Sequence, residues 1–220
     1  PAAVRKFIEV THEAYKRHVG GEFGKTIPGI FTDEPNFGHF HRRRQAIPWT
    51  DGLDEKFRAR FGYDLIDHLP ELWLDVEGAT PSKARHDYRQ LITELYVESF
   101  SKQIGDWCAA NGLESTGHEL CEESLPAQID QVGACMPHYE HFQRPGIDML
   151  MDRTPEVLTV KQCVSVASQL GRPRVLSELY GCTGWDATFE MYKHIGDWHQ
   201  ALGVNHFCPH LSWYSMAGGA

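Results

Sequence analysis

Two glutamates stand where short apolar strands are expected to end. Glu178 lies within the segment 175–181 (VLSELYG), which is typical of a buried strand that stops in a glycine turn. Glu34 follows a second apolar strand at 27–32 and precedes Pro35, which ends that strand. Because parallel strands bring their carboxyl ends to one edge of a sheet, both carboxyl groups are expected to face one pocket. A protonated carboxyl group facing a carboxylate predicts acid and base chemistry.

Other polar side chains occupy similar positions. His118 and Glu119 end an expected strand at 113–120, and Asp148 lies in a short strand at 146–150. Each is a candidate to hydrogen-bond a hydroxyl group of a substrate. Structural roles stay open beside this, because a buried His–Glu pair can satisfy itself and an aspartate can cap a loop.

Aromatic side chains also follow the expected strands. Tyr180 and Trp185 come directly after the strand that carries Glu178, and a last strand at 204–207 leads to His210 and Trp213. Such aromatic faces can stack on a ligand ring, and ordinary packing at the rim of the fold is the alternative.

The elements around these residues predict an α/β fold. Apolar side chains recur at helical spacing in the segments 4–18, 83–110, 156–170 and 187–202. Five strands separated by helical connections indicate a parallel sheet. Polar residues at the ends of several strands favour a (β/α)8 TIM barrel, and no glycine-rich phosphate-binding motif supports a nucleotide-binding sheet.

The segment 1–220 is therefore expected to be a single part of a barrel. Five strands do not close a barrel of eight, so we expect about strands four to eight of a (β/α)8 fold here. The region 36–81 is expected to be a long loop excursion with a small helix near 54–61. An incomplete barrel leaves sheet edges exposed, which favours self-association.

Composition limits the partners and the compartment. The net charge of -9, from 30 acidic and 21 basic side chains, disfavours a nucleic acid or an anionic membrane as partner. No apolar run reaches about 18 residues, so no membrane span is expected. Six scattered cysteines indicate neither a zinc ribbon nor a disulfide framework. Localisation stays open, and a periplasmic or secreted location is compatible with a signal upstream of this segment.

A metal-dependent hydrolase is one alternative. His39 and His41 have the H-x-H spacing of metal-dependent barrel hydrolases of the amidohydrolase type. They lie in a loop after Pro35 and run into the basic segment 42–44, which disfavours a cation site. We therefore assign no metal ligand. The basic segment is typical of a solvated surface.

The two glutamate turns resemble those of known enzymes. The turn Thr32-Asp33-Glu34-Pro35 resembles the Asn-Glu-Pro turn at the end of strand four in clan A glycoside hydrolases, although Asp33 replaces the asparagine. The segment 177–181 resembles their strand-seven nucleophile turn, and Trp213 is similar to their strand-eight tryptophan. The run from Gly117 to Ser212 also resembles bacterial glycoside hydrolases related to family 106, the α-L-rhamnosidases.

These resemblances imply a glycosidase that acts on a carbohydrate with Glu34 and Glu178 as its catalytic pair. Glu34 is the expected acid/base, and Glu178 is a nucleophile by the clan A resemblance or a base that activates water by the family 106 resemblance. The expected substrate-binding residues are Asp33, His118, Glu119, Asp148, Tyr180, Trp185, His210 and Trp213.

No cofactor is required for this chemistry, while the family 106 resemblance implies calcium, which carboxylate oxygens would bind. A sugar-binding barrel fragment without catalysis is the remaining alternative.

Overall fold

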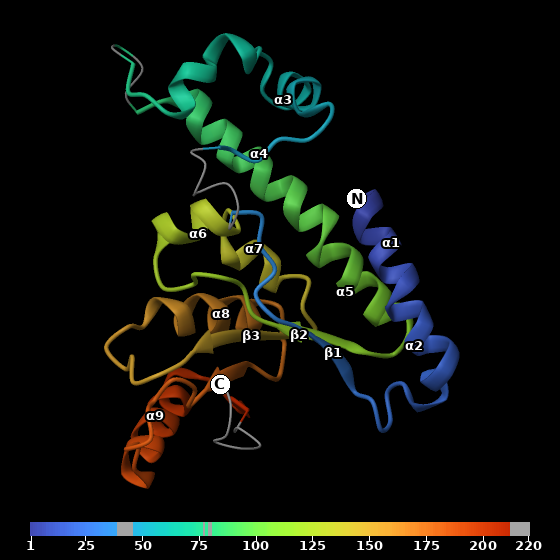
Figure 1. Ribbon diagram of the computed structural model, residues 1–220, viewed down its shortest axis with the longest axis vertical. Helices are drawn as coiled ribbons and strands as arrows, with labels where there is room; N and C mark the ends of the chain where they lie inside the picture. Colours follow the sequence, from blue (N-terminus) through green and yellow to red (C-terminus); the bar gives the residue numbers. More distant parts are fainter. Residues whose placement is uncertain (39–45, 77, 79–80, 212–220) are drawn as a thin grey trace.

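A computed structural model describes residues 1–38, 46–76, 78 and 81–211 of the chain. Helices and strands alternate along most of this length (Figure 1). The elements in chain order are α1 (Ala2–Val10), α2 (His12–Val19), η1 (Gly20–Glu22), β1 (Gly29–Thr32), α3 (Leu53–Phe61), η3 (Ile66–Leu72), α4 (Lys83–Ser99), α5 (Ser101–Ala110), β2 (Glu114–Gly117), α6 (Leu125–Gln131), α7 (Cys135–Tyr139), β3 (Arg144–Met149), α8 (Leu158–Gln169), β4 (Leu176–Leu179), α9 (Phe189–Leu202) and β5 (His206–Pro209). In this part of the chain, no helix combines the length and apolarity needed to cross a bilayer.

The described strands form one parallel sheet in the order β1-β2-β3-β4-β5. Each strand therefore lies beside the next one in the chain, and every crossover contains at least one helix. This arrangement is a five-stranded half-barrel, so the expected α/β fold with a partial parallel barrel is confirmed at that level.

The number of paired positions differs between neighbouring strands of the sheet. Strands β3 and β4 pair over four positions, including Asp148 with Glu178. Strands β2 and β3 pair at Thr116 with Arg144 and at Gly117 with Pro145, and no described pair follows toward the carboxyl edge. The two strands therefore diverge just where the sequence predicts functional side chains.

Gly117 is required where β1 and β2 approach each other. A Cβ atom at this position would lie 2.0 Å from the carbonyl oxygen of Thr32, and the backbone φ of +140° disfavours any other residue. The expected strand at 113–120 therefore ends at Gly117. His118 and Glu119 follow it in a turn above the sheet.

Apolar packing fixes the helices on the sheet. The largest cluster joins α7 and α8 to β3 through side chains such as Tyr139, Ile147 and Val160, all buried. A smaller cluster joins α1 and α5 to the start of β2 around Ile104 and Leu113. Burial of such side chains contributes about 1.5–3 kcal/mol each, which makes these contacts the main support of the sheet.

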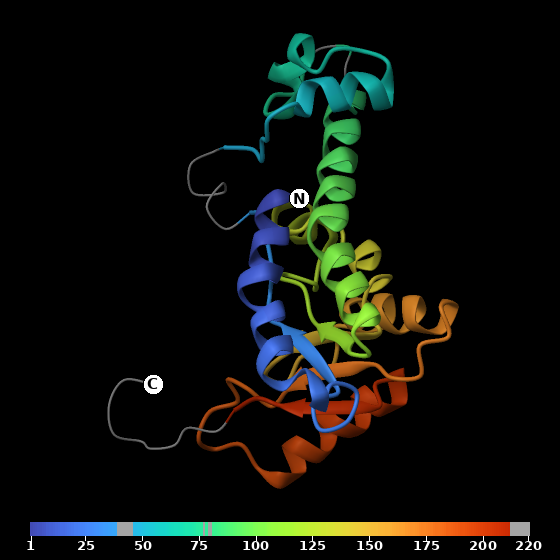
Figure 2. The ribbon, with the colours of Figure 1, turned by 90° about the vertical axis from the view of Figure 1, so that its right-hand side faces the viewer.

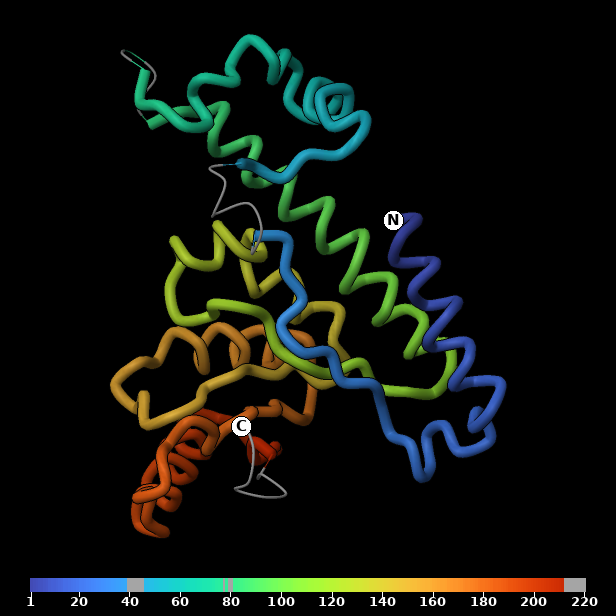
Figure 3. The backbone as a smooth tube through the Cα atoms, viewed as in Figure 1, coloured from blue at the N-terminus to red at the C-terminus, as the bar shows by residue number. Residues whose placement is uncertain are grey.

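The region between β1 and β2 contains more structure than a loop. Helices α3 and η3 pack on the first half of α4 around Leu53, Phe57 and Tyr88, which are buried. Figures 1 and 2 show this unit at the end of α4, away from the sheet. Figure 3 follows the chain from β1 out to α3 and back along α4 and α5 to β2. The positions 39–45 and 77, 79 and 80 of the 36–81 region lie outside the described residues.

Two of the helices expected as single runs are broken. The segment 83–110 divides into α4 and α5 at Phe100, and the segment 4–18 divides into α1 and α2 at Thr11. Both residues have φ near -110°, well away from the helical value of about -63°, while the apolar spacing continues through them. Periodicity alone does not detect such a change of direction.

Candidate active site

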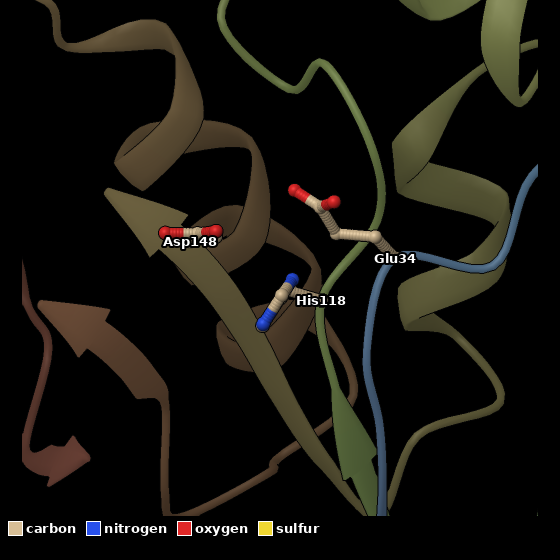
Figure 4. Close-up of side chains that lie close together, drawn as sticks. All are labelled: Glu34, His118 and Asp148. Atoms are coloured by element: carbon tan, nitrogen blue, oxygen red, sulfur yellow. The ribbon is translucent and has the colours of Figure 1, made fainter. Parts of the chain in front are cut away.

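Three side chains converge at the carboxyl edge of the half-barrel. Glu34 follows β1, His118 follows β2, and Asp148 lies near the end of β3. One potential ligand atom from each of the three lies within 4.8 Å of the other two (Figure 4). His118 is fully buried, whereas Glu34 and Asp148 are half-buried and reach solvent. Neighbouring strands thus deliver an imidazole and two carboxyl groups to one point.

Glu178 joins this group through His118. Its Oε2 lies 2.9 Å from Nε2 of His118, and Asp148 is its register partner on the neighbouring strand. Asp33 borders the same ring, with Oδ1 3.7 Å from Nε2, and its side chain is largely exposed. His118 is therefore surrounded by carboxylates. Burial alone would lower the pKa of His118, but the charge of Glu122 and the hydrogen bond to Glu178 raise it above the ordinary value.

The carboxyl groups of the site have raised pKa values. Burial raises the pKa of Glu34, and the negative charge of Asp148 adds to this effect. Burial likewise raises the pKa of Asp148, and the charge of Glu178 adds to it, although His118 opposes the shift. A half-buried carboxyl group that holds its proton toward neutral pH can act as a general acid.

Backbone strain concentrates at this edge. Within the described ranges, the non-glycine residues with positive φ are Glu34, Cys121, Met151, Tyr180 and Cys182. Each lies within four residues after a strand of the sheet. A left-handed conformation costs on the order of 1 kcal/mol or more at such residues, so the surrounding fold must hold it in place. The strain sets the direction in which the Glu34 side chain leaves β1.

Two pockets open beside the strained turns. The first has a volume of about 270 Å³ and is lined by Glu34, Glu119, Glu122, Asp148 and Arg153, among other residues. The second, of about 520 Å³, lies beyond β4 and β5. Residues that line the second pocket include Tyr180, Trp185, Tyr192 and His210. Cys182 lines both pockets, so they adjoin.

The residues expected to bind substrate fall into three groups. Asp33, His118, Glu119 and Asp148 surround the catalytic candidates or the first pocket. Tyr180, Trp185 and His210 line the second pocket, where Trp185 is 78% exposed. Trp213 lies outside the described residues, as do His39, His41 and the basic segment 42–44.

Glu119 differs from the others in its surroundings. The side chain is 1% exposed, and neither carboxyl oxygen has a hydrogen-bond partner in the described part of the chain. Nδ1 of His138 lies 3.6 Å from Oε1, but burial lowers the pKa of this imidazole to about 4, so it does not supply a cation near neutral pH. Burial raises the pKa of Glu119 well above the ordinary value, with the Glu122 charge as a second cause. Burial therefore favours the protonated form of the Glu119 carboxyl group.

Sequence reasoning missed Glu122. This residue lines the first pocket, is 3% exposed, and hydrogen-bonds the backbone of Asp148. It belongs to the polar run Cys121-Glu122-Glu123-Ser124, whose composition is typical of an exposed turn. The one available signal is the short distance in sequence from His118 and Glu119.

Comparison with known proteins identifies the family of the chain. A family model described as alpha-L-rhamnosidase, Glyco_hydro_106, matches residues 1–215. The chain belongs to glycoside hydrolase family 106. The expected relation to this family is therefore confirmed.

A solved structure shares the fold of this family 106 chain. It is described as a rhamnosidase from Novosphingobium sp. PP1Y, and it superposes with a TM-score of 0.75 at 22% sequence identity. The match covers 96% of the present chain and 20% of the rhamnosidase, so the chain spans about a fifth of that enzyme. At this identity the likeness establishes the fold alone. None of the curated protein sequences compared with the chain matches it.

Proposed function

We propose that this family 106 chain carries the catalytic centre of a glycosidase that hydrolyses α-L-rhamnosides. The observation that supports the proposal most is the convergence of Glu34, His118 and Asp148 at the carboxyl edge of the sheet, with Glu178 hydrogen-bonded to the same imidazole. In a (β/α)8 barrel this edge carries the active site. The five strands would be strands four to eight of that barrel.

Glu34 is the proposed general acid. Burial and the charge of Asp148 raise its pKa, which keeps a proton available for the oxygen of the leaving group. Cleavage of the glycosidic bond produces an oxocarbenium-like transition state, and protonation of the leaving oxygen lowers its energy. The side chain is half-buried and lines the first pocket, so a bound sugar can reach it.

Glu178 is the proposed base or nucleophile. In the described residues, His118 Nδ1 has no hydrogen-bond partner, so the natural place for its proton is Nε2, which then donates to Glu178 Oε2. This bond orients one carboxylate oxygen and leaves the other free to act. Glu178 either attacks the anomeric carbon, with retention, or removes a proton from water, with inversion. A carboxyl separation of about 5–5.5 Å favours the first and about 6.5–9.5 Å the second.

The remaining residues would bind the sugar. Asp33 and Asp148 stand beside the pair and can accept hydrogen bonds from hydroxyl groups, while the protonated form of Glu119 can donate one. Tyr180, Trp185 and His210 would contact the leaving group in the adjoining pocket, where an aromatic face can stack on a sugar ring.

The acid and base steps require no cofactor. Calcium, which the family resemblance implies, prefers oxygen ligands, and the carboxylates of Glu34 and Asp148 fit that preference, whereas the His118 nitrogen does not. Calcium bound there would orient hydroxyl groups of the sugar. A carboxylate that binds a cation cannot keep its proton, so strong binding at Glu34 would oppose its role as acid. Activity that survives a chelator would support the scheme without a cofactor, and activity restored by calcium would support the ion.

Kinetics of two glutamine variants in the full-length protein test the assignment. Glu34→Gln should lower kcat by orders of magnitude on a rhamnoside with a poor leaving group and much less on an activated aryl rhamnoside, which needs little acid assistance. Glu178→Gln should abolish turnover of both substrates. Glu140→Gln is a matched control, because Glu140 is exposed and lines neither of the two pockets. Near-normal turnover of Glu34→Gln or Glu178→Gln on the poor substrate would contradict the assignment.

A further inference from the structure

Glu122 lies between the diverging ends of β2 and β3. Pairing of these strands ends at Gly117 and Pro145, whereas β3 remains paired with β4 through Asp148 and Met149. The N–H of Asp148 donates to Oε2 of Glu122 at 2.9 Å instead of to a neighbouring strand. The Glu122 carboxylate therefore takes the place of strand pairing at the position of a candidate site residue.

The same carboxylate holds the end of β2. Its Oε1 accepts the N–H of Glu119 at 3.2 Å, and Glu119 directly follows His118. One carboxyl group thus joins the backbone beside His118 to the backbone of Asp148. Burial raises the pKa of Glu122 to about 8, whereas the hydrogen bonds from Tyr139 and from the two N–H groups favour its charged form. The distance between these two strand ends is set by the width of the carboxylate group together with two hydrogen bonds.

Buried contacts fix Glu122 itself. The hydroxyl group of Tyr139 on α7 donates to Oε1 at 2.5 Å. Side-chain amides of Gln128 on α6 and Gln162 on α8 donate to the Glu122 carbonyl oxygen at 2.8 and 3.1 Å. Cys121, immediately before it, has a φ of 60°, which turns the chain inward. Three helices therefore brace this one residue, and buried networks of this kind are rigid when every member is paired.

We propose that Glu122 is a positioning residue for the catalytic centre, whose carboxylate bridges the backbone of Glu119 and Asp148 and sets the spacing of His118 and Asp148. The inference rests on the proposed function. Glu122 does not contact the substrate in this role, because both of its oxygens accept hydrogen bonds from the protein and its exposure is 3%. Displacement of reacting groups by about 1 Å reduces catalysis by about 100-fold, so the spacing matters to the rate.

A pair of variants separates positioning from general stabilisation. Glu122→Gln keeps the shape but places an NH2 group against either the Asp148 N–H or the Glu119 N–H, so one arm of the bridge breaks. Tyr88→Phe is the matched control, because it removes the hydrogen bond of a buried tyrosine hydroxyl group to the Pro48 carbonyl, in the helical unit away from the sheet, and leaves both arms of the bridge intact. In the full-length protein well below its melting temperature, Glu122→Gln should lower kcat by about 10- to 100-fold with KM changed by less than about 3-fold. Tyr88→Phe should keep kcat within about 3-fold.

Equal kcat values for the two variants would overturn the proposal. Amide hydrogen exchange of the unmodified protein provides a second measurement if Glu122→Gln does not fold. The Asp148 amide should then exchange as slowly as those of Ile147 and Met149, and exchange at the rate of an unprotected amide would overturn the bridge. The kcat of Glu34→Gln, measured in the same assay, separates a failure of the Glu122 bridge from a failure of the proposed glycosidase function. Loss of activity in Glu34→Gln with none in Glu122→Gln refutes the bridge alone, while full activity in Glu34→Gln refutes the proposed function.

Discussion

The imidazole of His118 contacts the carboxylate of Glu178 across an intervening strand. His118 follows β2 and Glu178 lies on β4, with β3 between them in the sheet, yet Nε2 and Oε2 are 2.9 Å apart. Neighbouring strands are about 4.8 Å apart, so β2 and β4 backbones are separated by roughly twice that distance in the sheet. The two side chains therefore bridge β3, and the orientation of Glu178 depends on a residue two strands away.

Removal of the His118 nitrogen should disorient Glu178. His118→Phe keeps a ring of similar shape in this buried position but cannot hydrogen-bond the carboxylate, so kcat of the full-length protein should fall by about 100-fold. His118→Gln retains an amide donor near the position of Nε2 and should recover part of the loss. Steady-state kinetics of both variants on an aryl α-L-rhamnoside provide the measurement. A fully active His118→Phe variant would show that Glu178 needs no such support.

The pH dependence of activity should follow the proton on Glu34. A general acid is active while protonated, so activity should decrease as the pH rises through the raised pKa of Glu34. Asp148→Asn removes the negative charge that contributes to this shift and should move the basic limb to lower pH. Burial, the larger cause, persists, so the limb should stay above the ordinary value for glutamate.

Profiles of kcat/KM against pH for the wild-type protein and the Asp148→Asn variant test this expectation. Asp33→Asn is a useful comparison, because Asp33 contributes to the same shift after Asp148 and should move the limb in the same direction. A basic limb that stays in place, or moves upward, in Asp148→Asn would exclude Glu34 as the titrating acid.

Acid should destabilise the fold through His138. This buried ring hydrogen-bonds Ser101 Oγ at 2.7 Å and the Val132 carbonyl at 3.2 Å, and burial lowers its pKa to about 4. The folded state thus favours the neutral ring, and its contribution is fully present above about pH 6.5 and lost as the pH falls toward 4. The shift corresponds to about 3 kcal/mol of unfolding free energy.

Urea unfolding at pH 7 and at pH 4.5 measures this loss. His138→Gln can still donate to the Val132 carbonyl but does not titrate, so the difference in unfolding free energy between the two pH values should shrink in the variant. An unchanged difference would assign the acid sensitivity to other groups.

Substitution of Gly117 should be far more destabilising than substitution of a glycine that has open space around its Cα atom. Gly117→Ala places a Cβ atom 2.0 Å from the Thr32 carbonyl and enforces a φ of +140°, so the strands must separate and unfolding free energy should fall by about 3 kcal/mol or more. Gly112→Ala is the matched control, since φ at Gly112 is also positive but an added Cβ atom would meet no neighbouring atom within 4 Å. It should cost about 1 kcal/mol. Thermal or urea unfolding compares the two, and equal losses would show that β1 adapts.

The isolated chain should self-associate through the edges of its sheet. Strands β1 and β5 each pair with one neighbour in the described part, and Phe31 on β1 is 41% exposed. Unpaired backbone groups beside an exposed apolar side chain favour pairing with a second chain. Sedimentation velocity across a range of concentrations should show dimers or larger species. A Phe31→Lys variant should reduce them, and a strictly monomeric wild-type chain would contradict the prediction.

The candidate residues could be found from the sequence because each lies in a recognisable strand or just after one. Glu34 follows a short apolar segment and precedes a proline, whereas Glu178 and Asp148 lie within buried strands. A parallel sheet then brings such positions together regardless of their distance in the chain. The gathering of Glu34, His118 and Asp148 follows from topology more than from any local motif.

The β2 strand, the burial of Glu122 and the helix break at Phe100 could not be predicted from the local sequence. The polar sequence of β2 (ESTG) forms a strand because β1 and β3 lie on either side of it. Glu122 is buried because Tyr139, from α7, donates to it. The break at Phe100 interrupts a continuous apolar spacing, so the helical period gives no sign of it. Burial of an acidic residue in a turn is decided by its partners, which lie elsewhere in the sequence.

The cluster of left-handed residues at the carboxyl edge ties conformational stability to function. Glycine at Cys121, Met151 or Cys182 would relieve steric strain at these turns, yet it would also widen the range of conformations open to the turns that line the first pocket. At the rim of the pocket, selection for a more stable fold and selection for a pocket of fixed shape would therefore favour different amino acids.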